Sequence, residues 1–275
     1  MTKRLSPGRA GFLCLVGPAL LCVLLVSCDD KKAADTVPSA ALPSAHALPP
    51  PPPAEKEIAP VEKEEEIKKK DPKDCKPGKT VDFGGDTALE NQVRLKLSKP
   101  EGDIAVSDLP KIKSINLSQV KINQLDPCIY PHFTGVKDLF LGQGKLDDLG
   151  PIAGLHNIES LRASLNRVTD LKPLATLTKM DRLDLGHTRV SDLSPLANMT
   201  SLTDLQVDDT QVSDLAPLAS CTKLERLSIQ RTNVKDLSPL KGLDHLKFLY
   251  VTGAPINDKS VLGALSARGL KIVDE

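Results

Sequence analysis

A column of aspartates recurs in the second half of the chain and is the first feature that could do chemistry. Asp148, Asp170, Asp192, Asp214 and Asp236 stand 22 residues apart, and stacked carboxylates can bind calcium or act in acid–base catalysis. Each of them, however, stands three residues before a proline, where a carboxylate can accept a backbone N–H at a bend. We therefore predict that these aspartates support the backbone and take part in no reaction.

The other nucleophiles and potential ligands lack the spacing of an enzyme or a metal site. The chain has 6 Cys and 5 His, but it contains no CxxC, HExxH, GxSxG or glycine-rich phosphate loop. Lys+Arg 36 balance Asp+Glu 36, so the composition gives no basic surface for nucleic acid. We expect no enzymatic activity, no cofactor, no metal ion and no nucleic-acid partner.

The N-terminus has the pattern of an export signal. Lys3, Arg4 and Arg9 precede an apolar stretch that ends in Leu-Val-Ser-Cys at 25–28, and this stretch is short for a membrane span. The four residues resemble the lipobox of bacterial lipoproteins. The resemblance implies that residues 1–27 are removed and that Cys28 carries lipid such as palmitate. An uncleaved anchor helix and an ordinary signal peptide are the alternatives.

Residues 28–78 are rich in Pro and Ala and then strongly charged, with no apolar periodicity that could form a core. We predict a disordered tether that holds the folded part away from a bacterial membrane, facing the periplasm or the cell surface. The charge run could instead contact peptidoglycan or the membrane.

Residues 112–257 repeat an aliphatic pattern, first after 24 residues and then every 22. One copy is DRLDLGHTRVSDLSPLANMTS and the next is TDLQVDDTQVSDLAPLASCTK. The pattern L-x-x-L-x-L-x-x-T/N-x-V is that of leucine-rich repeats, in which each unit supplies one short strand and one return segment. We predict an α/β solenoid with short parallel strands on its concave face and 3-10 or irregular segments on its convex face.

Proline, serine, and threonine or asparagine recur at fixed positions of these units, and we assign them structural roles. Proline suits the first position of a helical turn, and Ser194 and Ser238 are expected to cap two such turns. Asn166 and the threonines after it are expected to bond the turns. The recurring residues are Pro127, Pro151, Pro173, Pro195, Pro217 and Pro239, and Thr188, Thr210 and Thr232.

Both ends of a solenoid need a cap, because the terminal repeats would otherwise expose apolar surface. Residues 79–111 are the predicted N-terminal cap, with Thr87 and Glu90 as a capping box that begins a helix. Residues 258–275 are the predicted C-terminal cap, with a helix from Asp258 and a last strand from the Leu-Lys-Ile-Val that follows.

Three cysteines belong to the predicted folded part and the segment next to it. Cys75 precedes the N-terminal cap and Cys128 lies in the irregular first unit, and an extracytoplasmic location permits a disulfide between them. Cys221 takes an aliphatic position of its repeat and is expected to be a buried thiol.

The repeat SDLSPLANMTSLTDL is similar to the 22-residue repeats of internalin-type bacterial leucine-rich-repeat proteins. Upstream, DTALENQVRLKLSKPEGDIAVSDLPKIKSINLS resembles the helical N-terminal cap of bacterial members of that group. The resemblance covers Asp86 to Ile256. It implies a curved solenoid whose concave face binds another macromolecule, usually a protein. Thr mostly replaces the Asn usual in the repeat, and the chain has no Gly-Trp module or cell-wall sorting motif, so a host-invasion role is not implied.

The variable outward positions of the strands form the candidate partner-binding surface. Phe248 and Tyr250 are the expected interface anchors, with packing against the C-terminal cap as the alternative. The mixed charges either bind a charged partner or a cation, or serve solubility. The residues predicted to contact a partner are Phe140, Arg162, Arg182, Asp184, His187, Asp204, Gln206, Asp208, Arg226, Arg231, Phe248 and Tyr250.

The predicted function is that of a monomeric, lipid-anchored module of the bacterial envelope that binds a protein partner. A cell-surface adhesin that contacts other cells and a passive envelope spacer are the alternatives.

Overall fold

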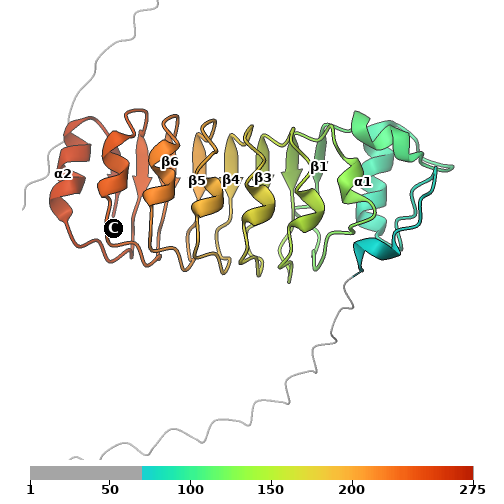
Figure 1. The fold of residues 1–275 in the computed structure, drawn as a ribbon, viewed down its shortest axis with the longest axis horizontal. Helices are drawn as coiled ribbons and strands as arrows, with labels where there is room; N and C mark the ends of the chain where they lie inside the picture. The colour runs from blue at the N-terminus through green and yellow to red at the C-terminus, as the bar shows by residue number, and fades with distance from the viewer. Residues whose placement is uncertain (1–69, 275) are drawn as a thin grey trace, which may run out of the picture. The chain divides into compact units, whose positions relative to one another are not determined.

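The structure, a computed structural model, describes residues 70–274. The expected export signal and lipidated Cys28 lie outside the described residues. Within residues 70–274, eight strands form one parallel sheet in chain order (Figure 1). The strands are β1 (Ser114–Asn116), β2 (Asp138–Phe140), β3 (Ser160–Arg162), β4 (Arg182–Asp184), β5 (Asp204–Gln206), β6 (Arg226–Ser228), β7 (Phe248–Tyr250) and β8 (Lys271–Val273).

The register of the sheet follows the sequence repeat. Ser114 of β1 lies opposite Asp138 of β2, which is the longer first step, and Leu183 of β4 lies opposite Leu205 of β5, one repeat further on. The middle residue of each strand points into the core and the two outer residues point away, as alternation along a strand requires. The predicted leucine-rich-repeat solenoid is confirmed.

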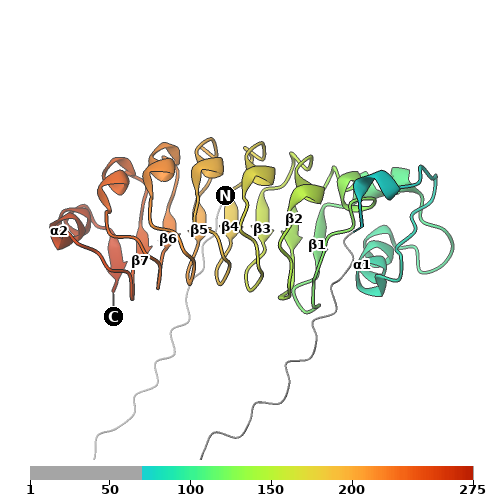
Figure 2. The same cartoon turned by 60° about the horizontal axis from the view of Figure 1, so that its bottom comes forward.

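Short 3-10 turns return the chain along the side opposite the strands (Figure 2). Proline is the second residue of each turn from η3 to η8, where its fixed φ and missing N–H cost nothing. In η3 this residue is Pro131, so the expectation that Pro127 holds the same place as the later prolines was wrong. The turns are η1 (Pro72–Asp74), η2 (Val106–Lys111), η3 (Tyr130–His132), η4 (Gly150–Ile152), η5 (Lys172–Leu174), η6 (Ser194–Leu196), η7 (Ala216–Ser220) and η8 (Ser238–Gly242).

The aspartate column accepts backbone hydrogen bonds just before these turns. Asp192 Oδ1 accepts the N–H of Ser194 at 2.8 Å, and Asp236 does the same for Ser238. The Ser194 hydroxyl, followed by its backbone N–H, holds the pKa of Asp192 below the usual range. The Ser238 backbone N–H, followed by its hydroxyl, does the same for the pKa of Asp236. The expected role of the serines as caps was wrong: each is the first residue of its turn, and no side chain caps the turn from the preceding Leu. The other three aspartates bond in the same way: Asp148 to Gly150, Asp170 to Lys172 and Asp214 to Ala216.

The core is an aliphatic stack that continues from repeat to repeat. Leu183, Leu205 and Leu227 are fully or almost fully buried, and Cys221 is buried among them as expected. Burial raises the pKa of that thiol, so it is a core side chain and not a reactive thiolate. No buried side-chain N or O atom of the described part lacks a hydrogen-bond partner.

The threonine column closes the turn after each strand, as predicted. Thr188, Thr210 and Thr232 each donate a hydroxyl to the carbonyl three residues earlier, at 2.6 to 2.7 Å. Asn166 holds the same position one unit earlier and donates to the carbonyls of Gly142 and Ser164.

Helices α1 (Thr87–Leu97) and α2 (Lys259–Ala267) lie at opposite ends of the strand row (Figures 1 and 2). Asp258 caps α2 by accepting the N–H of Ser260, as predicted. The expected capping box of α1 was wrong. Asp86, one residue before Thr87, is the cap and accepts the N–H of Leu89. Glu90 pairs with Arg94 one turn along the helix instead.

The chain enters the described part next to the first repeat. The last residues assigned to the tether contain the turn η1 and Cys75, which forms a disulfide with Cys128. Lys70 forms an ion pair of 2.9 Å with Asp126 in the same region. A covalent bond and an ion pair therefore fix this segment to the start of the solenoid.

We expect Leu205→Ala to lower the free energy of unfolding by about 2–5 kcal/mol, because it leaves a cavity in a close-packed stack. Leu205 is 0% exposed. Gln206→Ala, at the outward position beside it, should change stability by about 0.5 kcal/mol or less. Urea unfolding of both variants measures the difference, and equal effects would contradict the assigned register.

Candidate functional site

The outward residues of the strands form a continuous surface, called here the strand face: the first and third residues of β1 to β8. The middle residue of every strand except β8 is buried, whereas most first and third residues are at least partly accessible. Ser160 and Ser228 are buried exceptions. Short side chains in these positions leave room for their larger neighbours.

Charges in the middle of the strand face are paired across neighbouring strands. The Nε of Arg162 lies 3.2 Å from Oδ2 of Asp184, and the Nε of Arg226 lies 3.7 Å from Oδ2 of Asp204. Gln206 donates a long hydrogen bond, 3.3 Å, to Asp204. Arg182 faces Asp181, just before its own strand, at 3.5 Å. The middle of the face is therefore close to neutral.

A second row of residues borders the strand face where each strand has ended. Leu165, His187, Asp209 and Arg231 stand one repeat apart, and all four have a positive φ between 51° and 59°. We call this row the left-handed ridge. Residues with a Cβ rarely adopt this conformation, and Gly253 occupies the same slot in the next unit.

Three members of the ridge form one charged chain. Oδ1 of Asp209 accepts the Nε of Arg231 at 2.7 Å, and Oδ2 lies 3.4 Å from Nε2 of His187. The Arg231 hydrogen bond, followed by the charges of His187 and Arg231, holds the pKa of Asp209 below its usual range. Asp209 also raises the pKa of Arg231. The chain remains at least half exposed at His187 and Arg231.

Asp208 has a different role from its neighbour. Its Oδ1 accepts the hydroxyl of Ser228 at 2.6 Å and the backbone N–H of Gln230 at 2.7 Å. Asp184 likewise accepts the Ser164 hydroxyl and the N–H of Gly186. These carboxylates connect adjacent repeats, so the acids that the sequence grouped together divide between the strand face, the ridge and the repeat junctions.

The C-terminal end of the strand face is aromatic. Phe248 lies between two cations, with the Arg226 guanidinium 5.4 Å and the Lys271 ammonium 5.5 Å from its ring centroid. Tyr250 lies between Ser228 and Val273 on the neighbouring strands. Both aromatic residues remain partly exposed, with β8 beside them. Phe140, on β2, is a third partly exposed aromatic residue near the other end.

The hollows on this surface are small. One of about 200 Å³ lies beside Phe248, with Arg182, Asp204 and Arg226 among its walls. Another of about 230 Å³ lies between Arg162, Leu165 and the first strand's loop. No group of three or more His, Cys, Asp or Glu in residues 70–274 is placed to hold a metal ion. The surface suits contact with a macromolecule more than enclosure of a small substrate.

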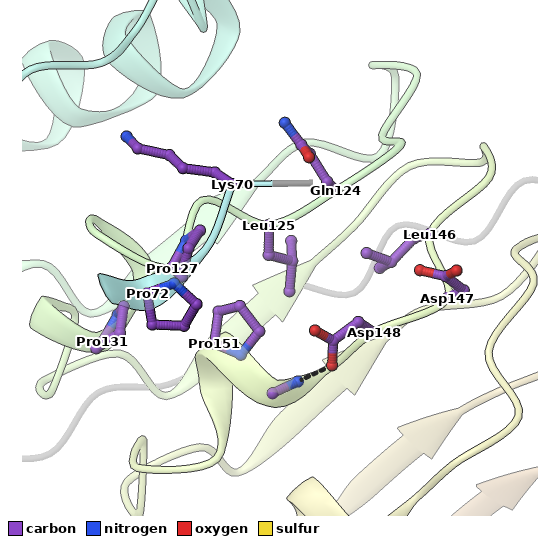
Figure 3. A pocket seen from close by; sticks show the side chains of 11 residues that line it. Lys70, Pro72, Gln124, Leu125, Pro127, Pro131, Leu146, Asp147, Asp148 and Pro151 are labelled. Carbon is purple, nitrogen blue, oxygen red and sulfur yellow. Dashed lines mark hydrogen bonds between the residues drawn. The ribbon is translucent and has the colours of Figure 1, made fainter. Parts of the chain in front are cut away.

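A more apolar cavity of about 210 Å³ lies away from the strand face, beside the turns η3 and η4 (Figure 3). Pro72, Pro127, Pro131 and Pro151 surround it, and Asp148 at its edge is bound to the N–H of Gly150. The disulfide Cys75–Cys128 lies within three residues of three of these prolines, Pro72, Pro127 and Pro131. The cavity is therefore part of the junction between the entering segment and the repeats.

Leu165 is the surface residue that the sequence analysis missed. It is 46% exposed and lies on the left-handed ridge. Gly253 in the equivalent slot was the available signal, because glycine favours positive φ.

The comparisons agree with this geometry. The family model described as "Leucine Rich repeats (2 copies)" matches residues 156–198. The repeats are leucine-rich repeats. No curated protein sequence matches the chain.

Two solved internalins of Listeria monocytogenes have a similar structure. An internalin (inlF) is 27% identical with a TM-score of 0.62 over 68% of this chain and 54% of its own. An internalin C2 (inlC2) is 27% identical with a TM-score of 0.61 over 68% of this chain and 91% of its own. The chain thus spans about half the length of the first. A Leptospira interrogans leucine-rich-repeat protein, 17% identical with a TM-score of 0.50 over 61% of this chain and 50% of its own, shares the fold.

We expect Leu165→Asn to raise the free energy of unfolding by about 0.5–1 kcal/mol, because asparagine tolerates the left-handed conformation better than leucine. Leu165→Ala is the matched control, since alanine removes the exposed side chain and keeps the strained Cβ. Urea unfolding compares the two variants with the parent. A stability gain for alanine equal to that for asparagine would show that backbone strain is not the cause.

Proposed function

We propose that this protein is a lipid-anchored binding module of a bacterial envelope and that its strand face captures a protein partner. The observation that carries the proposal is the pair of partly exposed aromatic residues on β7, Phe248 and Tyr250. Leucine-rich repeats provide a rigid support for such a surface, because each unit is held by its neighbours.

The aromatic residues are suited to supply binding energy. Phe, Tyr and Arg are enriched at protein interfaces, and a few such residues carry most of the affinity. Phe248 and Tyr250 project from the same strand to the same side. Phe140 lies five strands away, a distance of roughly 24 Å at about 4.8 Å per strand. A partner that touches both ends must therefore span most of the strand face, which favours a protein over a small molecule.

The envelope location rests on the N-terminal sequence. None of the helices in residues 70–274 is long and apolar enough to cross a membrane. The lipobox-like residues that end at Cys28 supply the proposed anchor, and an oxidising compartment is consistent with the Cys75–Cys128 disulfide.

We expect Phe248→Ala combined with Tyr250→Ala to weaken partner binding by about 2–4 kcal/mol, because both rings lose contact area that sheds water on binding. The partner is first identified by photo-crosslinking in cells from position 248, with position 172 on the opposite side as the negative control. Binding of the purified partner is then titrated against the parent protein and the double variant.

The matched control changes Lys172→Ala and Lys241→Ala, which lie in the turns opposite the strands, and should leave binding unchanged. Thermal unfolding of each variant separates loss of contact from loss of fold. A partner that crosslinks from position 172 and not from 248 would place the binding surface elsewhere.

We expect Cys28→Ser to abolish lipid attachment, since serine offers no thiol for acylation, and to release the protein from the membrane fraction or leave it uncleaved. Metabolic labelling with a palmitate analogue measures the attachment. Equal labelling of the parent and the variant would remove lipid anchoring from the proposal and leave the binding surface unaffected.

A further inference from the structure

We propose that the C-terminal end of the strand face selects an acidic partner segment, in which carboxylates flank an apolar side chain. This inference rests on the proposed binding function and specifies the partner's chemistry. The surface consists of the outward residues of the last three strands, and we call it the terminal patch: Arg226, Ser228, Phe248, Tyr250, Lys271 and Val273.

The terminal patch has cations and no acid among its own residues. Arg226 and Lys271 stand on the two strands that flank β7, and the charged groups of both lie about equally far from the Phe248 ring, at 5.4 and 5.5 Å. In the middle of the face, by contrast, Arg162 contacts Asp184 directly. A cation is attracted less strongly by an aromatic ring than by a carboxylate at short range. The charge of Lys271 therefore remains available to an incoming acid, and Arg226, whose Nε lies 3.7 Å from Asp204, can turn from that acid to a closer one.

The acids around the terminal patch are engaged or distant. Glu225 is bound to Lys247 at 2.8 Å, and that bond lowers its pKa. Asp204 lies 3.7 Å from Arg226 Nε, beyond hydrogen-bond length, and also accepts Gln206. Asp274 comes directly after Val273, the last residue of β8, and is three residues away from Lys271 in the sequence.

Lys271 is the clearer of the two cations. Among residues 70–274, no carboxylate forms an ion pair with its ammonium group, which lies over the Phe248 ring. The side chain is exposed. Its charge is therefore the least compensated on the terminal patch.

Apolar surface next to these cations sets the second requirement. Phe248, Tyr250 and Val273 are at least partly exposed, and Val273 is 42% exposed. A highly charged partner without apolar side chains would leave this surface in water. Two cations are also few for a nucleic-acid backbone, whose binding grows with the number of phosphates neutralised. An apolar residue over Phe248 with an acid on each side satisfies both requirements.

The geometry fixes an approximate spacing for the acids. Arg226 and Lys271 stand two strands apart, which is roughly 9–10 Å across the sheet. In an extended segment, residues i and i+4 lie about 13 Å apart and point to the same side as residue i+2. The reach of the Arg and Lys side chains covers the difference. The expected motif is therefore acid, any residue, apolar, any residue, acid.

The test is a selection of peptides from a random displayed library on the intact protein, in about 0.15 M NaCl so that distant charges are screened. We expect the selected peptides to be enriched in Asp or Glu two residues from an aliphatic or aromatic residue. A recovered peptide should bind at least tenfold more weakly, by fluorescence anisotropy, when its acids are replaced by Gln.

Charge variants of the protein test whether Arg226 and Lys271 cause the preference for acidic peptides. Arg226→Glu with Lys271→Glu should reverse the preference toward Lys and Arg, and Arg226→Gln with Lys271→Gln, which adds no repulsion with Asp204, should abolish it. Lys172→Glu with Lys241→Glu makes the same change of net charge on the opposite side and should retain the parent's preference. Thermal unfolding verifies that each variant is folded.

The results separate this inference from the proposed function. Selection of neutral or basic peptides, a preference unchanged by the Gln pair, or no enrichment at all would overturn the acidic specificity. If such peptides, or the natural partner, still lose affinity on Phe248→Ala with Tyr250→Ala, the strand face remains the binding surface. If acid-selective binding responds to the charge pairs while the natural partner ignores both the aromatic and the charge variants, the patch binds acids and the proposed function fails.

Discussion

The structure depends on one constraint: each repeat must return its chain to the same place after 22 residues without leaving a polar backbone group buried and unbonded. The Leu at the centre of each strand needs its counterparts in the adjacent repeats, because a single coil cannot bury it. Asp192 and its equivalents accept the N–H of the first residue of each turn, and Thr188 and its equivalents donate to a C=O just after each strand. These bonds are local, so every coil is completed by its own residues and the aliphatic stack can continue.

That constraint explains which parts of the structure followed from the sequence. The period, the strand register and the aspartate bonds all repeat, and a repeated pattern averages out local ambiguity. Helix α2 was also predictable, because Asp258 and the apolar spacing after it agree. The start of α1 was not, since Asp86 and Thr87 are both good cap residues and the choice depends on the path of the incoming chain. The predicted capping by the serines was wrong for a similar reason: Asp192 and Asp236 accept the N–H groups of Ser194 and Ser238, and each serine is the first residue of its turn and not the residue before it.

The surface was less predictable than the core for a related reason. The sequence identifies which side chains point outward, but it does not determine which neighbours they contact. Asp208 and Asp209 are adjacent, yet one connects two repeats and the other joins His187 to Arg231. Their separate roles follow from the change of direction at the left-handed ridge, which sends successive side chains to different places. The position of Gly253 indicates that ridge only once the register is known.

The strand face is uneven in a way that matters for recognition. Its central ion pairs are exposed, and such pairs contribute little to stability, so a partner can displace or rearrange them at small cost. The same pairs give little charge preference, because each cation already has an acid beside it. At the C-terminal end Lys271 contacts the Phe248 ring and no carboxylate of residues 70–274, while Arg226 is shared between that ring and Asp204 at 3.7 Å. Positive charge is therefore left for a partner to neutralise. Affinity from apolar contact and selectivity from charge therefore coincide on the last three strands, where β8 adds Lys271 and Val273 to a surface that the repeats alone would end at Tyr250.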